Sequence, residues 1–458
     1  ILDIGLQLSY GGTIGIVLIY PILKKLKKKK EDKNSKFKKI IHKVKEKILD
    51  IILITISANL VIFPIVLFHY NTISFTFIIS NLLISPIIGI IIILGFISVF
   101  ASYIISPISK VMFLILQTFL NLLIKIAHFC AELPFSKVYF PTPKIYVIII
   151  YYVFLILIIL ERNKIIVIKK INKKIIIIFV IIIIILNLIL NFIPKTFTIS
   201  FIDVGQGDSM LISTPKGKKI LIDGGGSRDE ESFNIGKQTL IPYLLNKGIT
   251  KLDYILISHF DSDHATGVAQ ILGKIDVSSI ILTRQLEEND IYRHILSIAK
   301  EKKIKLIYVK EGDVLKIGGI KISIIHPENK LMINNPMNNN SIVCKVEYNS
   351  FSMLLTGDIE MEAEELILRK NINLKADVLK VAHHGSKTST TGEFLKAINP
   401  KVALIGVGKN NNFGHPSNEV IQRLKENGTR IYRTDENGEI SITVNKKGRI
   451  IKIQRCIT

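Results

Sequence analysis

The chain has 458 residues, of which 48% are hydrophobic, and it carries a formal net charge of +23. Apolar residues form long runs in its first part, whereas the second part alternates short apolar runs with Gly, Asp, Asn and Pro, so the composition excludes a wholly soluble protein and a purely membrane-embedded one. The three cysteines follow no pairing pattern, which excludes a disulfide framework and a thiolate zinc cluster.

Long apolar runs dominate the chain up to about residue 195. Most of them reach the roughly 20 helical residues that cross a hydrocarbon core of about 30 Å. The run 72–105 could form one tilted span or a broken one, and 145–160 is short for a span. The predicted spans are 48–70, 72–105, 107–128, 145–160 and 175–193.

The pattern changes near Pro194, where short β-rich runs begin. We therefore expect a helical membrane domain over 1–194 and a soluble α/β domain over 195–458. The residues Ile1–Pro21 resemble the end of a further membrane segment, so we expect the chain to be a fragment of a longer protein.

Most of the excess positive charge lies in two loops between apolar runs. Residues 24–47 carry thirteen Lys against three acids, and 161–174 carry six Lys or Arg against one acid. Lysine-rich loops between spans normally face the cytoplasm, and the four runs between these two loops allow both to do so. The run 175–193 would then place the soluble domain on the extracytoplasmic side. A lysine-rich genome is the alternative explanation of the charge.

Polar residues inside the predicted spans have two interpretations. Singly, each is expected to bond a neighbouring helix, whereas together they would also suit a polar passage. Pro64 and Pro86 remove helical hydrogen bonds, so other groups must satisfy the backbone near them. The polar residues are Asn59, His69, Asn81, Gln117, Asn121 and His128.

The soluble half places acids and imidazoles at the ends of predicted strands. In "ISHFDSDHATG", residues 257–267, a strand leads to His259, Asp261, Asp263 and His264. The runs "SMLLTGDIE" and "ADVLKVAHHGSKTS" then end in Asp358 and in the pair His383 and His384. Three strands that deliver such residues to one edge predict a metal site. Asp203, Asp208 and Asp223 also follow strands, but each alone is expected to be a turn or cap residue.

These motifs carry a resemblance. HFDSDH, TGD and HHGS, behind DVGQGDS and LIDGGG, resemble the metallo-β-lactamase superfamily, whose fold is an αββα sandwich with metals at one edge. The stretches "GLQLSYGGTIGI" and "ANLVIFPIVLFHYNTISFTFIISNLLISPIIG" look like the membrane region of the ComEC family of DNA-internalisation proteins. The resemblance implies a plasma-membrane protein that passes one DNA strand and hydrolyses the other outside.

The resemblance also implies a ligand set. The superfamily binds two metals, and the second metal's ligands are matched by Asp263, His264, bridging Asp358, and His383 or His384. The first metal's set, with His259, is weakened. Asp261 stands where the family has a histidine, so it would be a weak ligand of a second ion or a base that orients water.

The family's lone histidine is also missing. Asn339, Asn340 and Ser341 stand near its position, and for His326 we favour a turn histidine held before Pro327. Exchanging imidazole for carboxylate shifts preference towards Mn²⁺ or Mg²⁺, although Zn²⁺ stays a candidate.

Other residues of the matched motifs are candidate substrate contacts. His415, in "GKNNNFGHPS", would face the cleft and bind the phosphate or protonate the leaving oxygen, and Arg433 would contact phosphate. Gln206, Asp208 and Ser386 complete this set.

Expected partners are DNA, the lipid bilayer and other competence-machinery proteins, and self-association into a homo-oligomer is left open. Two alternatives stand beside the nuclease: a channel whose second domain only binds DNA, and a membrane-tethered esterase for small or cell-wall phosphodiesters.

Overall fold

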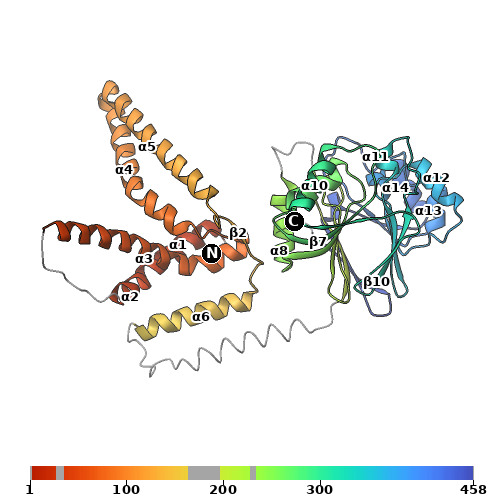
Figure 1. Ribbon diagram of the computed structural model, residues 1–458, viewed down its shortest axis with the longest axis horizontal. Coiled ribbons are helices and arrows are strands. Elements are labelled where there is room, and N and C mark those ends of the chain that lie inside the picture. Colours follow the sequence, from red (N-terminus) through yellow and green to blue (C-terminus); the bar gives the residue numbers. More distant parts are fainter. Residues whose placement is uncertain (1–2, 27–35, 163–195, 227–233, 457–458) are drawn as a thin grey trace. The chain divides into compact units, whose positions relative to one another are not determined.

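The computed structural model describes residues 3–26, 36–162, 196–226 and 234–456, which group into two compact units (Figure 1). One unit is helical and is formed chiefly by residues up to Ile182, and the other is built on β-sheets and follows it. The predicted boundary at Pro194 and the predicted span 175–193 lie outside the described residues.

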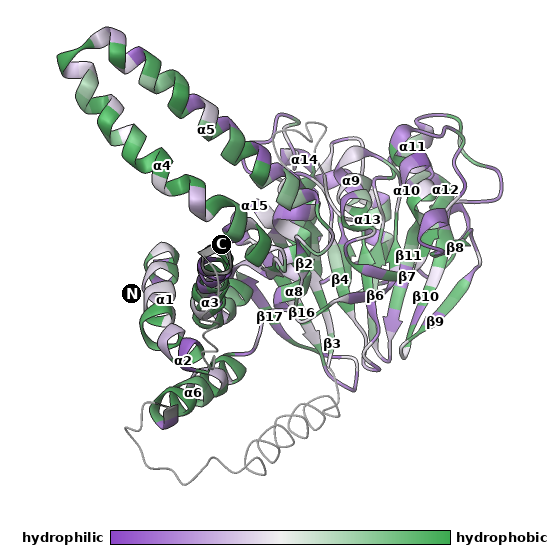
Figure 2. Cartoon of the chain, turned by 60° about the vertical axis from the view of Figure 1, so that its left-hand side comes forward, coloured by the Kyte–Doolittle hydropathy of each residue, from purple (hydrophilic) through white to green (hydrophobic). Residues whose placement is uncertain are grey.

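The helical unit contains four helices that are long and apolar enough to cross a membrane: Ile4–Lys25, Ile40–Tyr70, Phe77–Ile104 and Ser106–Glu132. Most of the run 72–105 forms one helix, Phe77–Ile104, in spite of Pro86, and the run 145–160 lies in a shorter apolar helix. Figure 2 shows how apolar residues cover these helices. The elements are α1 (Ile4–Leu18), α2 (Tyr20–Lys25), α3 (Lys36–Tyr70), β1 (Thr72–Ile73), α4 (Phe77–Ile104), α5 (Ser106–Glu132), β2 (Val138–Tyr139) and α6 (Ile145–Arg162).

Helix α3 depends on a neighbour at its internal proline. Pro64 has no N–H, so the carbonyl of Leu60 loses the helical donor that would come from position 64. The hydroxyl of Tyr151, on α6, donates to that carbonyl at 2.6 Å. A polar side chain of the adjacent helix therefore replaces the missing bond, as the proline led us to expect.

The second unit is a sandwich of two mixed sheets. The eight-stranded sheet has the order β17-β16-β3-β4-β5-β6-β7-β8, and the seven-stranded sheet has the order β15-β14-β13-β12-β11-β10-β9. The first sheet contains β3 (Phe197–Phe201), β4 (Met210–Ser213), β5 (Lys219–Ile222), β6 (Lys251–Leu256), β7 (Asp276–Leu282), β8 (Lys305–Tyr308), β16 (Glu439–Val444) and β17 (Ile450–Cys456).

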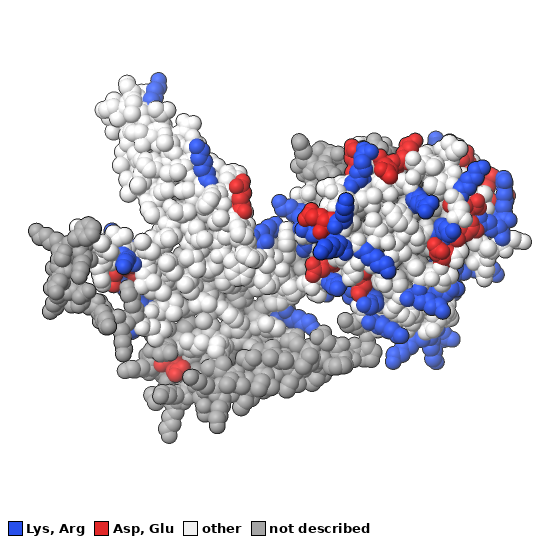
Figure 3. Space-filling view, in the orientation of Figure 1, with Lys and Arg blue, Asp and Glu red and all other residues white. Residues whose placement is uncertain are grey.

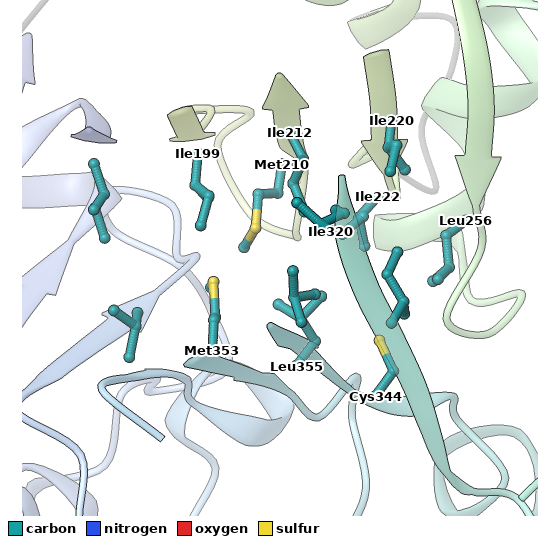
Figure 4. Packing of buried hydrophobic residues seen from close by; sticks show 14 of the residues in the cluster. Ile199, Met210, Ile212, Ile220, Ile222, Leu256, Ile320, Cys344, Met353 and Leu355 are labelled. Atoms are coloured by element: carbon teal, nitrogen blue, oxygen red, sulfur yellow. The ribbon is translucent and has the colours of Figure 1, made fainter. Parts of the chain in front are cut away.

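The second sheet contains β9 (Val314–Ile317), β10 (Ile320–His326), β11 (Val343–Tyr348), β12 (Phe351–Leu355), β13 (Val378–Lys380), β14 (Val402–Ile405) and β15 (Arg430–Arg433). The inner faces of the sheets share one apolar core, in which Ile199 and Met210 meet Met353 and Leu355 (Figure 4). This core arises because alternate strand residues point to opposite faces.

Helices cover the outer faces. Ala363, Phe394 and Leu424 belong to an apolar cluster that packs helices α12, α13 and α14 on the second sheet, and α8 and α10 lie beside the first (Figure 1). The predicted αββα architecture is confirmed. The helices are α8 (Ile241–Asn246), α9 (Ser262–Ile271), α10 (Asp290–Glu301), α11 (Pro336–Asn339), α12 (Met361–Arg369), α13 (Gly392–Ile398), α14 (Asn418–Glu426) and α15 (Thr434–Asn437), with a π-helix at Gly236–Leu240 and a 3₁₀ turn at Ala382–Gly385.

Candidate metal centre

The glycine-rich loops pack against the first turn of α9 at one edge of the sandwich. Gly207 has φ +120°, and a Cβ added there would lie 2.1 Å from the carbonyl oxygen of Asp263. A Cβ on Gly226 would lie 1.9 Å from the carbonyl oxygen of Ser262. The glycines of GQGDS and DGGG are therefore needed to let two loops touch the helix that carries the site.

Two buried histidines present the same ring atom to the centre of this edge. The Nδ1 of His264 lies 3.0 Å from Asp223 Oδ2, and the Nδ1 of His384 lies 2.7 Å from the carbonyl oxygen of Gly406. These bonds place the proton on Nδ1 of each ring and leave Nε2 as a metal ligand.

Four ligand atoms then converge. Asp358 Oδ2 lies 3.2 Å from the Nε2 atoms of both His264 and His384, which are 3.2 Å apart, and Asp263 Oδ2 lies 3.3 Å from His384 Nε2. A tetrahedral ion with bonds of about 2.0–2.1 Å separates its ligand atoms by about 3.3 Å. The spacing therefore fits a divalent ion, with His384 rather than its neighbour His383 as the second imidazole.

Asp208 lies close to this cluster but on another side of it. One atom from each of Asp208, His264, Asp358 and His384 falls within 4.8 Å of the others. However, Asp208 approaches the two imidazoles at Nδ1, at 3.9 and 3.7 Å, and its carboxylate contacts the ammonium of Lys380. We therefore count Asp263 as the fourth ligand. Asp208, expected to bind substrate, is instead buried beside Lys380.

Lys380 is a buried cation under the centre. Its Nζ donates to Asp358 Oδ1 at 3.1 Å and to the carbonyl of Gly357 at 2.8 Å, besides contacting Asp208. One oxygen of Asp358 thus faces the imidazoles while the other faces the ammonium. Lys380 therefore orients the carboxylate of Asp358 and offsets part of the negative charge.

The charges of the cluster are strongly coupled. Burial opposes protonation of His384, but the carboxylates of Asp358 and Asp208 outweigh it and raise its pKa to about 10. Burial also disfavours ionisation of Asp358, yet the cations of His264, His384 and Lys380 hold its pKa well below its usual range. Without an ion the imidazolium protons neutralise the carboxylates, and a divalent ion would replace them.

His259 and Asp261 lie where a second metal ion could bind. Burial, reinforced by the neighbouring His264, lowers the pKa of His259 to about 3, so its ring is neutral. Its buried Nε2 has no hydrogen-bond partner among the described residues and lies 3.8 Å from Asp261 Oδ2. This orphaned acceptor fits a second, weaker ligand pair.

The missing third imidazole has no substitute among the described residues. The amide nitrogen of Asn340 donates to the carbonyls of Met332 and Pro336, so this side chain stabilises its own loop and is not directed at a metal ion. His326 is buried, and its Nε2 donates to the carbonyl of Asn339 at 2.7 Å. It is thus held in its turn outside the cluster, as we favoured.

A cavity of about 710 Å³ opens over the cluster. Gln206 lines it and accepts a bond from the N–H of Gly408. His415, predicted to face the cleft, is not among the described lining residues, but it packs against two of them, His383 and Phe413, with ring centroids 5.7 and 6.0 Å away. The lining residues are Asp203, Val204, Gly205, Gln206, Gly226, Ile235, Thr239, Asp261, Ser262, Asp263, Asn338, Asp358, His383 and Phe413.

Two expected substrate contacts point elsewhere. The hydroxyl of Ser386 lies 3.0 Å from that of Thr388. The guanidinium of Arg433 forms a bidentate ion pair with Asp435 and a further ion pair with Glu436. Neither residue is among the described residues that line the cavity.

Sequence reasoning missed the roles of Asp223 and Lys380. Asp223 looked like a turn residue, and only the fold brings it to the ring of His264. Lys380 offered a signal, a single cation within the apolar run "DVLKVA" just before the paired histidines. A charge in a buried strand needs partners, and here they come from β12 and from the loop after β3.

Comparisons with known proteins agree with both units. Residues 1–164 match the "Competence protein" family model, and residues 202–409 match the "Metallo-beta-lactamase superfamily" model. ComE operon protein 3 of Bacillus subtilis is 39% identical over 253 residues, which are 53% of this chain and 32% of that protein. Recombination protein 2 of Haemophilus influenzae is 31% identical over 54% of this chain and 29% of its own length.

A solved structure of a putative metal-dependent hydrolase from Parabacteroides distasonis is 18% identical, with a TM-score of 0.33 over 52% of this chain and 92% of that one. The sequence matches span about a third of the length of the curated relatives. The chain combines a helical region that matches the Competence protein model with a domain that matches the metallo-β-lactamase model, which agrees with the resemblance to the ComEC family.

Proposed function

We propose that this chain acts in DNA uptake and that its sheet domain is a metal-dependent nuclease. The helical unit would pass one strand, and the domain would hydrolyse the other outside the membrane. The carrying observation is the convergence of His264, His384 and Asp358 at the spacing of tetrahedral ligands, with Asp263 beside His384, below an open cavity. The match to the Competence protein model and the resemblance to ComEC proteins support DNA as the substrate.

The residues of the centre divide the work. A bound divalent ion supplies a lowered pKa for water and a polarised phosphoryl oxygen. Asp223 and Gly406 hold the two rings in place, and Lys380 holds the bridging carboxylate. Asp261, at the cavity, is suited to orient the attacking water or to hold a second ion.

His415 is better suited to bind phosphate than to act as an acid. Burial, together with the nearby His383 and His384, lowers its pKa to about 4. The ring is therefore neutral near pH 7 and would donate a hydrogen bond to a phosphoryl oxygen without transferring a proton.

The donor set favours Mn²⁺. Two imidazoles and two carboxylates bind Zn²⁺ as well, but Asp261 adds an oxygen ligand where a further imidazole would favour zinc. We therefore propose Mn²⁺ as the working ion and Zn²⁺ or Mg²⁺ as competitors.

The test uses the full chain in detergent micelles with two substrates, DNA and bis(p-nitrophenyl) phosphate, with and without Mn²⁺. We expect Mn²⁺-dependent DNA degradation that falls at least about a hundredfold in Asp358→Asn, because the bridging ligand is weakened. Asp203→Asn is the matched control, since Asp203 lines the cavity outside the cluster. DNA that is bound but not cut would indicate a binding module, and cleavage of the small diester alone would indicate a tethered phosphodiesterase.

A further inference from the structure

The edge of the sandwich opposite the metal centre is a continuous surface of hairpin turns from both sheets. The N–H of Lys216, in the β4–β5 turn, donates to Gly318 in the β9–β10 turn at 3.1 Å. Asn349 and Ser350, in the β11–β12 turn, donate to the carbonyls of Lys446 and Lys447 at 2.7 and 2.6 Å. We call this surface, formed by residues 214–219, 316–319, 349–350 and 445–449, the turn edge.

The turn edge is strongly basic. Lys218 pairs with Asp253, whereas its other exposed cations make no ion pair with any residue in the described part of the chain. Figure 3 shows Lys and Arg gathered along the lower border of the sheet unit. The exposed cations are Lys216, Lys218, Lys316, Lys446, Lys447 and Arg449.

The chain enters the sheet domain at this edge. Strand β3 lies between β16 and β4, and its first residue, Phe197, pairs with Val444, while Thr198 pairs with Ser213. The β16–β17 and β4–β5 turns therefore flank the entry point on both sides. The apolar run 175–193, predicted to cross the membrane, ends four residues before Phe197. Four extended residues reach at most about 14 Å.

A membrane span at 175–193 would keep the basic turns close to the bilayer surface. The Debye length is about 8 Å at physiological ionic strength, and a lysine near an anionic bilayer contributes attraction over that range. A soluble DNA has no comparable tether to the turn edge. DNA bound at the turn edge would also lie about 20 Å from the metal centre, measured along the strands, so the centre could not reach its phosphates.

We propose that the turn edge binds the anionic phospholipid headgroups of the membrane that anchors the chain. Binding there fixes the sheet domain on the bilayer with its metal centre turned away from the lipid. This inference needs the predicted span 175–193 but does not need the nuclease activity.

Amine labelling of the full chain tests the proposal. The chain is placed in nanodiscs of phosphatidylcholine, with or without phosphatidylglycerol, and its lysines are modified for a short time and read by mass spectrometry. We expect Lys216, Lys446 and Lys447 to react at least about threefold more slowly on anionic discs. Lys387 and Lys409, exposed in the loops that follow β13 and β14 at the metal-centre edge, serve as controls and should react equally on both. Equal rates at the turn edge on the two discs would overturn the proposal.

A charge variant provides the second measurement. Replacing Lys216, Lys218, Lys446 and Lys447 by Gln should abolish the difference between the discs, because each lysine near an anionic surface is worth about fivefold in binding. The replacement of Lys237, Lys330, Lys387 and Lys409 by Gln, four exposed lysines towards the metal-centre edge, is the matched control. Protection of the turn edge by added DNA, without protection by anionic lipid, would assign the surface to nucleic acid and overturn the proposal.

Discussion

Asp223 shows how a residue outside the ligand set can govern metal binding. It accepts the Nδ1 proton of His264 and also accepts the N–H and hydroxyl of Ser258, so Ser258 holds the carboxylate that orients the ring. We expect Asp223→Asn to weaken Mn²⁺ binding by about 10–100-fold, as is usual for such partners. Calorimetric titration of the full chain measures this, and Asp203→Asn should bind as wild type does. Unchanged affinity in a folded Asp223→Asn protein would contradict the assignment.

His326 should make stability depend on pH. Burial lowers its pKa to about 4, against about 6.5 in an unfolded chain. The unfolded state therefore binds the extra proton first, and the stabilisation present above pH 6.5 is lost as the pH falls towards 4. The loss amounts to about 3 kcal/mol.

Urea unfolding of residues 196–458 from pH 7 to 4 checks this against His326→Gln. The difference in unfolding free energy between wild type and variant should shrink by that amount as the pH falls. A constant difference would mean that His326 is protonated in the native state. The other histidines remain in both proteins and cancel in the comparison.

At the residue scale, the sequence predicted the acids and imidazoles that meet but not their contacts. Asp263, His264 and Asp358 follow strand ends, where parallel strands bring residues together. The choice between His383 and His384 could not be made, because both residues adopt left-handed backbone conformations and only the turn decides which ring faces inward. Asp208 and Lys380 pair across the sandwich, a contact that no local pattern encodes.

At the scale of elements, the proline in α3 gives a sharp test of helix packing. Tyr151→Phe removes the donor to the Leu60 carbonyl and should cost about 1–3 kcal/mol, because that carbonyl is then unsatisfied. In a Pro64→Ala background the restored N–H satisfies the carbonyl, so Tyr151→Phe should cost almost nothing. The unfolding free energies of wild type, Tyr151→Phe, Pro64→Ala and the double variant, measured in mixed micelles, give the coupling energy between the two positions. Additive effects would show that the hydroxyl does not replace the lost bond.

The elements themselves were mostly readable from the sequence. The length of the apolar runs predicted α3, α4 and α5, and short apolar runs separated by Gly, Asp, Asn and Pro marked the sheets. The strand order was not readable, because β16 pairs with β3 from far along the chain. The glycine motifs are visible in the sequence, but only the folded sandwich shows that they approach the first turn of α9 closely.

At the scale of the whole molecule, the membrane topology can be read with the protein's own thiols. Cys456 is exposed, whereas Cys130 and Cys344 are buried. If the sheet domain is extracytoplasmic, an impermeant maleimide should label Cys456 in intact cells, and Cys456→Ser should remove the signal. Lys36→Cys, added to Cys456→Ser, should react only after permeabilisation, since position 36 lies in the lysine-rich stretch between the candidate spans Ile4–Lys25 and Ile40–Tyr70. The reverse pattern would invert the topology.

The pairing of β3 with β16 also limits how early the sheet domain can complete its first sheet during synthesis. The hydroxyls of Ser200 and Ser441 lie 2.5 Å apart although 241 residues separate them along the chain. A ribosome that adds about 5–20 residues per second needs roughly 10–50 s to span that interval. During this time the strand next to the predicted anchor has one open edge, which can pair with other chains. Synthesis that stops before Glu439 would leave that edge open permanently, so truncated products should aggregate at the membrane while the complete chain does not.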